Sequence, residues 1–262
     1  MTKKILYLWA CDYSENSGEG NLARIFVKYL EDKKKFTLRV NINKKFSNYR
    51  YLSPFMGILF CWRCFLRNRQ VSYINYLPLW NFFIFILLPP KTILGPVTGG
   101  ANYLNSNKFN YFIRKFIFPI FYKISEFFLY LRSEKIYFST NLLKKYLSKK
   151  TKNKSIFNFI IKNIDFKKPV KKNKNIDFII YYRKHINKET FFPYEFIKKL
   201  AFFGYKILVI GNKLNIKKIK NCGFLDNNSI KKLQSRSRFT IASEENIYSI
   251  FTIECLSNDV KI

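Results

Sequence analysis

The chain has 262 residues, of which 48% are hydrophobic, and its formal net charge is +32. The hydrophobic fraction excludes a disordered tail, and the length is enough for one or two ordinary cores. The five cysteines are scattered and odd in number, which argues against a disulfide framework and for a reducing compartment.

The positive charge has two interpretations. One is an anionic partner such as nucleic acid, membrane lipid or a phosphorylated substrate. The other is compositional bias, because Lys, Asn, Ile, Phe and Tyr are abundant together and the basic residues are spread over the whole chain. The bias accounts for the larger part, and the remainder favours a cytoplasmic leaflet that carries anionic lipid.

Strands and helices alternate in the first part of the chain. In chain order, we predict a strand at 4–10, a helix at 22–30, strands at 36–41 and 71–76, a helix at 79–87, a strand at 91–94, a helix at 110–131, a strand at 135–138 and a helix at 141–147. No apolar run reaches the roughly 20 residues of a membrane span. Charged residues interrupt 110–131, so packing on a sheet is favoured there over an interfacial membrane helix.

A polar, basic and proline-containing stretch at 165–175 predicts a linker. The alternation restarts after it, with strands at 176–181, 206–210 and 239–242, helices at 192–203 and 228–235, and a last helix capped by Ser249. Gly204 is a stop signal for the helix at 192–203. The pattern predicts an α/β fold with two Rossmann-like domains, 1–168 and 169–262.

The strongest chemical signal is a strand, acidic loop and helix at 238–262. The start of such a helix offers backbone N–H groups and a positive dipole, which suit a diphosphate. Glu254, further along the helix, can accept hydrogen bonds from ribose hydroxyls. On physics alone, an ordinary surface loop with acids at a helix start explains the same residues.

This segment resembles the donor-site signature of family-four retaining glycosyltransferases, in which two glutamates are separated by seven residues. Glu254 matches the second glutamate, whereas the first falls on Asn246, with Glu245 one residue earlier. Asp259 and Lys261 stand where the family usually has Gly and Pro. The resemblance implies donor contacts at the loop and helix start by Glu245, Asn246, Tyr248, Ser249 and Ile250.

Further matches follow the same order along the chain. Arg183 and Lys188 resemble the family's Arg and Lys that hold the diphosphate, as charge on the leaving group requires. Gly223 and Phe224 resemble the loop beside the nucleotide base. The family often has a glycine-bearing acceptor-side loop after the first strand, and some members have a Gly-Pro-x-x-Gly-Gly loop at the interdomain cleft. Their counterparts here are Gly18, Gly20, Gly99 and Gly100.

The resemblance implies a GT-B fold and an enzyme that transfers sugar, with retention, from a nucleotide-diphosphate sugar to a glycan or lipid-linked acceptor. Arg183, Lys188 and Glu254 are the implied catalytic set, without a metal or cofactor. The implied setting is polysaccharide or lipopolysaccharide synthesis, cytoplasmic or at the inner membrane face with peripheral contact to anionic lipid. The family continues beyond the position of Ile262, so we expect an incomplete second domain.

Two alternatives stay open. The charge and the many aromatic residues suit a basic nucleic-acid-binding protein, although no known binding motif is present. The second alternative is a non-catalytic, membrane-associated remnant of a transferase.

Cys61 and Cys64 form a lone CxxC pair, too few ligands for zinc, and His185 is the single histidine.

Overall fold

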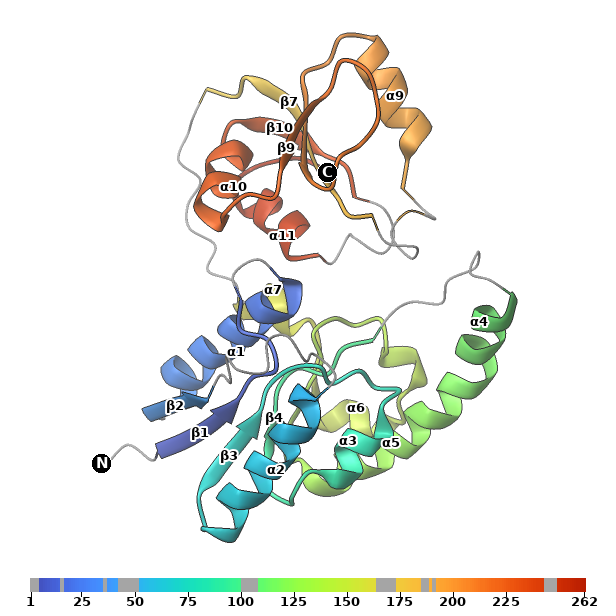
Figure 1. Cartoon of the computed structure of the whole chain (residues 1–262). Helices are drawn as coiled ribbons and strands as arrows, with labels where there is room; N and C mark the ends of the chain where they lie inside the picture. The colour runs from blue at the N-terminus through green and yellow to red at the C-terminus, as the bar shows by residue number, and fades with distance from the viewer. Residues whose placement is uncertain are drawn as a thin grey trace. The chain divides into compact units, whose positions relative to one another are not determined.

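A computed structural model describes residues 5–14, 17–34, 37–41, 52–99, 108–163, 173–184, 189, 192–242 and 249–262. The chain divides into two compact units, Met1–Ile164 and Asp165–Ile262 (Figure 1). Each unit contains a four-stranded parallel sheet with helices packed on it. The predicted α/β fold with two Rossmann-like units is therefore confirmed, and the predicted boundary at 168/169 lies outside the described residues.

The sheet of unit 1 has the order β2-β1-β3-β4, with every neighbouring pair parallel. Its strands are β1 (Ile5–Trp9), β2 (Thr37–Asn41), β3 (Gln70–Tyr73) and β4 (Ile93–Leu94). Leu6 and Leu8 of β1 are fully buried. Burial of alternate side chains on a central strand explains why this short apolar run forms a strand.

Five helical segments follow the strands of unit 1, and the first, second, third and fifth of them bury apolar side chains. They are α1 (Gly18–Lys34), α2 (Ser53–Leu66), α3 (Phe82–Leu87), α4 (Lys108–Phe112) and α5 (Phe118–Arg132), with a π-helical stretch, Ile113–Ile117, joining the last two. The helix predicted at 110–131 is thus present with a π segment inside it. Arg132 ties α5 to the end of α3, because its guanidinium donates to Phe85 O, Leu88 O and Pro89 O.

The helix predicted at 141–147 is wrong. The segment contains only a 3-10 turn, Lys144–Tyr146, and Leu147 is extended with ψ 145°. Ser148 begins a new helix there: its Oγ accepts from Thr151 N at 3.3 Å, and its own N–H donates to the Glu126 carboxylate of α5. Unit 1 then closes with α6 (Lys149–Lys154), the two-stranded pair β5 (Ile136–Tyr137) and β6 (Ser155–Ile156), and α7 (Phe159–Asn163).

The sheet of unit 2 has the order β10-β7-β8-β9, again parallel throughout. Its elements are β7 (Ile176–Tyr182), α9 (Tyr194–Phe202), β8 (Ile207–Gly211), β9 (Lys220–Gly223), α10 (Asn227–Gln234), β10 (Ser237–Thr240) and α11 (Ile250–Ser257). Ile180 and Val209 face α9 on one side, whereas Ile179 and Ile210 lie in the cluster with Cys255 of α11 on the other.

Gly223, which the sequence places in a loop, ends the edge strand β9 (Lys220–Gly223) instead. The polar side chain of Asn221 explains the difference. It accepts from Leu214 N at 2.9 Å and donates to Leu214 O at 3.2 Å, while the strand pairs with β8. A tertiary contact thus places a polar sequence at the sheet edge, against its low strand propensity.

Asp259 offers a test of local backbone strain. It follows α11 with φ +57°, and the hydrogen bonds Asp259 N to Leu256 O and Val260 N to Cys255 O close the helix. Glycine adopts this left-handed conformation without steric cost. We expect Asp259→Gly to raise the free energy of unfolding by about 0.5–1 kcal/mol, because its exposed ion pair with Lys174 contributes little. Urea denaturation measures the free energy of unfolding. An Asp259→Asn variant as stable as Asp259→Gly would contradict the prediction.

Candidate functional site

The strand order of unit 2 places a topological switch point, the position at which open α/β sheets form a crevice, at the carboxyl ends of β7 and β10. From β7 the chain moves to β8 and β9 on one side, and then returns to place β10 on the other side of β7. The helices that follow β7 and β10, α9 and α11, pack on opposite sides of the sheet. Ligands of open α/β sheets bind at such a switch point.

The β7 side of this crevice carries positive charge. Arg183 and Lys184 follow Tyr182 directly and are exposed. Lys184 N donates to Asn212 Oδ1 at 2.8 Å, and Asn212 N donates to Tyr182 O at 2.9 Å, which fastens the ends of β7 and β8 together. Arg183 therefore follows a strand end that two hydrogen bonds hold against β8. Lys188, its predicted companion, lies outside the described residues.

Gly211 makes this close contact between the ends of β7 and β8 sterically feasible. Its φ is +98°, and a Cβ atom there would lie 2.3 Å from Tyr182 O. Both the backbone conformation and the close approach of β8 to β7 exclude a larger residue.

The β10 side of the crevice contains the start of α11. Ser249 caps this helix, as predicted, with its Oγ accepting from Thr252 N at 3.1 Å. The cap fixes Ser249 and Ile250 at the helix start, where backbone N–H groups and the helix dipole favour an anion. Glu245, Asn246 and Tyr248 lie outside the described residues.

Glu254 lies on α11 and is partly buried. Burial raises the pKa of its carboxyl above the usual value, and the positive charge of Lys231 on α10 partly opposes this. The buried side chain of Gln234 joins the two helices, because its Nε2 donates to Phe251 O and its Oε1 accepts from Asn258. These contacts fasten α11, which carries Glu254, to α10.

Gly223 and Phe224 end β9 and start the loop after it, at the same carboxyl edge. Because β8 separates β9 from β7, these two residues lie further along that edge than Arg183. The Phe224 side chain is exposed. The structure thus brings Arg183 and the start of α11 to adjacent strand ends, whereas β7 and β8 lie between β10 and the strand that leads into the predicted base-side loop.

Unit 1 has a switch point of its own between β1 and β3. Asn75, buried at the end of β3, accepts from Cys11 N at 2.8 Å and Asp12 N at 3.3 Å and donates back to Asp12 O. Sequence analysis missed this residue, since an asparagine after a strand is usually a turn residue.

The glycines predicted to line the acceptor side lie in or next to packed elements. A Cβ atom at Gly20 would lie 2.1 Å from Ser14 O, so the loop after β1 and the first turn of α1 are in backbone contact. A Cβ at Gly99 would meet the Leu143 side chain at 2.5 Å, whereas Gly18 has open space. Gly100 lies outside the described residues.

Glu19, in the first turn of α1, is a second residue that sequence analysis missed. Its Oε2 is buried with no hydrogen-bond partner among the described residues. Burial raises the pKa of this carboxyl, and a backbone hydrogen bond from Tyr76 partly opposes the effect. The only sequence signal is that an acid stands between two glycines at a helix start, which is common for unrelated reasons.

Removing the Glu19 charge tests this burial. Because the pKa of Glu19 is raised in the folded state, the contribution of this group to the free energy of unfolding is fully present below the ordinary glutamate pKa. That contribution is lost as the pH rises through the folded pKa. We expect Glu19→Gln to raise the free energy of unfolding by about 1 kcal/mol at pH 8 and to have no effect at pH 4. Thermal unfolding at both pH values measures this. The exposed Glu31→Gln is the control, and equal gains in the two variants would contradict the prediction.

No group of three His, Cys, Asp or Glu side chains suited to a metal ion is found among the residues that the structure describes. Within the same residues, no helix is both long enough and apolar enough to cross a bilayer.

The sequence matches no family model, and no curated protein matches it. Solved structures with similar folds include the UDP-GlcNAc 2-epimerase of Methanocaldococcus jannaschii in complex with UDP-GlcNAc and UDP, which is 14% identical, with 92% of this chain and 79% of that chain covered and a TM-score of 0.45. The E. coli heptosyltransferase WaaC with ADP is 9% identical, with 98% and 85% covered and a TM-score of 0.37. A UDP-N-acetylglucosamine 2-epimerase from Rickettsia bellii is 10% identical, with 92% and 74% covered and a TM-score of 0.45. Similarities this low assign the chain to no family.

Proposed function

We propose that unit 2 binds a nucleotide-diphosphate sugar in the crevice between β7 and β10. The observation that carries the proposal is the placement of Arg183 and the start of α11 on the two sides of one switch point. A guanidinium and a helix N-terminus both attract a diphosphate, and they reach this edge from segments far apart in the sequence.

The proposed reaction is transfer of the sugar, with retention, to a glycan or lipid-linked acceptor in polysaccharide or lipopolysaccharide synthesis. Breaking the glycosidic bond leaves negative charge on the diphosphate, which Arg183 and Lys188 would neutralise as it develops. Glu254 would accept from the ribose hydroxyls, and Glu245 or Asn246 would contact the sugar. Unit 1, with the loops that contain Gly18, Gly20, Gly99 and Gly100, would bind the acceptor in a GT-B arrangement.

Thermal unfolding with UDP-, GDP- and ADP-sugars tests the binding step. A ligand that binds only the folded state stabilises it by about 2.7 kcal/mol when present at 100 times its Kd. We expect one nucleotide to raise the Tm, and Arg183→Ala to weaken that nucleotide's binding about tenfold or more, because a charge-assisted hydrogen bond to phosphate is lost. Arg236→Ala is the matched control, since Arg236 precedes β10 at the opposite, amino edge of the sheet. Equal losses of nucleotide affinity in both variants would show that the overall positive charge of the protein, and not Arg183 in particular, accounts for the effect.

Product analysis tests the transfer step separately. Incubation with the stabilising donor and a lipid-linked glycan acceptor should yield free nucleotide diphosphate and a product with the donor's anomeric configuration, which NMR reports. Release of free sugar alone, inversion, or conversion of the donor to an epimer would each contradict retaining transfer while leaving donor binding intact.

A further inference from the structure

The α2–α3 side of unit 1 carries apolar side chains that no neighbour among the described residues covers. Leu52 and the α2 residues Phe55, Leu59, Trp62 and Leu66 are between 38% and 76% exposed. The last four follow one another at helical spacings of four and three, so they form a single stripe along α2. Apolar patches of this kind mark interaction surfaces.

Helix α3 extends this stripe sideways. The Trp62 indole N–H donates to Leu87 O at 2.8 Å, which holds the two helices next to each other (Figure 1). On α3, Phe83, Ile86 and Leu87 are exposed as well. We call the exposed apolar residues of α2 and α3, together with Leu52, the apolar face.

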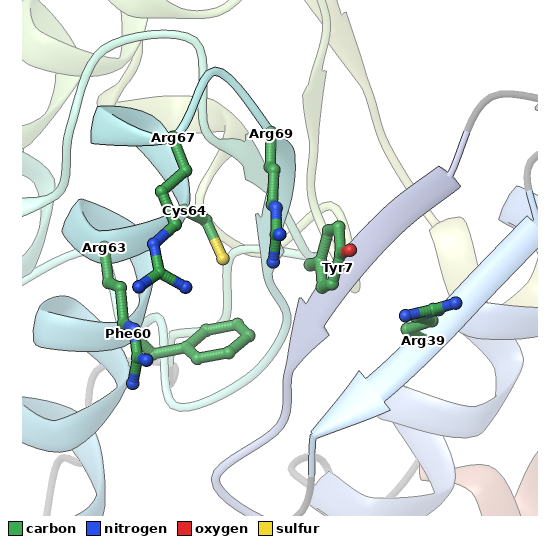
Figure 2. A pocket seen from close by; sticks show the side chains of 7 residues that line it. All are labelled: Tyr7, Arg39, Phe60, Arg63, Cys64, Arg67 and Arg69. Carbon is green, nitrogen blue, oxygen red and sulfur yellow. The ribbon is translucent and has the colours of Figure 1, made fainter.

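On the opposite flank of the α2 stripe lies a pocket of about 340 Å3. Figure 2 shows its lining: Phe60, Arg63 and Arg67 from α2, Arg69 before β3, Tyr7 from β1 and Arg39 from β2. Two of the arginines lie over one ring, with Arg69 Cζ 5.0 Å and Arg39 Cζ 6.0 Å from the Tyr7 centroid. No carboxylate among the described residues pairs with any of the four guanidinium groups.

The pocket is separate from the crevices at the carboxyl ends of the strands, because Arg69 precedes β3 at the amino edge of the sheet. Four guanidinium groups around one hollow attract an oxyanion, and arginine matches phosphate geometry through its planar donors. Their mutual repulsion is relieved when such an anion binds.

The segment of the sequence that forms α2 and α3 has a single sign of charge. Between Asp32 and Glu126 the chain contains no aspartate or glutamate, although this stretch includes all of α2 and α3. A compositional bias toward lysine does not by itself remove every acid from one continuous segment. An apolar face on helices whose only charged residues are cations complements a bilayer whose headgroups are anionic, where apolar side chains enter the interface and basic ones contact phosphate.

We propose that the apolar face of unit 1 docks on an anionic membrane and that the arginine pocket receives a lipid headgroup phosphate. Phe55, Leu59 and Trp62 enter the interfacial region, and Arg63 and Arg67 border the bound phosphate. The proposal does not depend on sugar-nucleotide binding by unit 2. It places any acceptor-binding loops of unit 1 on a body that is held at a lipid surface.

Co-sedimentation with vesicles tests the docking. Vesicles of phosphatidylcholine alone are compared with vesicles that also contain phosphatidylglycerol, at low and high salt. We expect binding to the anionic vesicles, weakened by salt. The Arg63→Gln/Arg67→Gln variant should lose about tenfold or more in partitioning to anionic vesicles, since each cation near the surface contributes about fivefold. The Phe55→Gln/Leu59→Gln variant should lose binding to a similar degree.

Matched controls remove the same groups elsewhere. Lys149→Gln/Lys150→Gln removes two exposed cations from α6, and Phe202→Gln/Phe203→Gln removes two exposed rings from unit 2. Circular dichroism and Tm confirm that each variant is folded. We expect both controls to bind as the unaltered protein does. Equal losses in the controls would overturn the proposal in favour of general charge and hydrophobicity.

Three further outcomes would also overturn it. Absence of vesicle binding together with a Tm increase in inorganic phosphate would assign the pocket to a soluble phosphate. Concentration-dependent dimerisation lost in the Phe55→Gln/Leu59→Gln variant would assign the apolar face to a second copy of the chain. Binding of an oligonucleotide, but not of vesicles, that is lost in the Arg63→Gln/Arg67→Gln variant would assign the surface to nucleic acid.

Discussion

Replacing Glu254 by Gln should stabilise unit 2 and at the same time weaken nucleotide binding at least tenfold. Burial raises the pKa of this carboxyl, so its ionised form is less stable in the folded chain than in the unfolded one. Glutamine has the same shape without the charge, and we expect it to raise the free energy of unfolding by about 1 kcal/mol at pH 8. The loss of binding has a separate cause, since an amide is a weaker acceptor for the ribose hydroxyls than a carboxylate.

The raised pKa of Glu254 also predicts how the effect of Glu254→Gln on stability depends on pH. The contribution of a group with a raised pKa to the free energy of unfolding is fully present below the ordinary glutamate pKa. It falls as the pH rises through the folded pKa. The stability difference between Glu254→Gln and the unaltered chain should therefore be present at pH 8 and absent at pH 4. Thermal unfolding measures stability, and calorimetric titration with the stabilising nucleotide measures binding.

Glu195→Gln is the control, because Glu195 is an exposed acid on α9 of the same unit. It should change neither quantity by more than about 0.5 kcal/mol. If Glu254→Gln instead lowered stability and binding together, the carboxylate would be a structural residue, and its assignment to the donor site would be wrong.

Gly95→Ala should unfold unit 1 or destabilise it by about 4 kcal/mol or more. A Cβ atom on Gly95 would lie 1.8 Å from Ile74 O and within 2.7 Å of two further backbone atoms of Ile74. Backbone atoms cannot turn aside as a side chain can. Ile74 N already donates to Trp9 O and Gly95 N to Tyr73 O, so relief of the clash must separate β4 from β3. Urea denaturation followed by circular dichroism measures the loss.

Gly18→Ala is the matched control for this prediction. Gly18 lies in the same unit and has no atom within 4 Å of an added Cβ. At the first position of α1, alanine should change stability by no more than about 0.5 kcal/mol. Similar stabilities for the two variants would show that β3 and β4 approach each other less closely than the structure indicates.

Short-range signals account for the elements that sequence analysis placed well. Gly204 ends α9 with φ +83°, as its position after a periodic apolar segment predicted. Ser249 caps α11 through a hydrogen bond to a residue three positions away. In both cases the residues that decide the structure are neighbours in the sequence, so the pattern alone contains the information.

Long-range contacts account for the failures. The 3-10 turn at Lys144–Tyr146 replaces a predicted helix because Ser148 bonds to Glu126, a residue of α5. The edge strand β9 has a polar sequence and depends on its pairing with β8 and on the contact of Asn221 with Leu214. Glu126 lies 22 positions from Ser148, and local propensity does not report the pairing of β9 with β8.

The sequence by itself determined the α/β class, most of the strands and helices, and Arg183 and Glu254 as candidates for one site. Only the tertiary structure decided that β10 lies beside β7, which brings Arg183 and the start of α11 to one crevice. It also decided that Glu19 is buried and that arginines from three separate segments surround one pocket. The physical reason is that strand order, burial and charge clustering are set by contacts between distant residues, whereas propensity and capping act within a few positions.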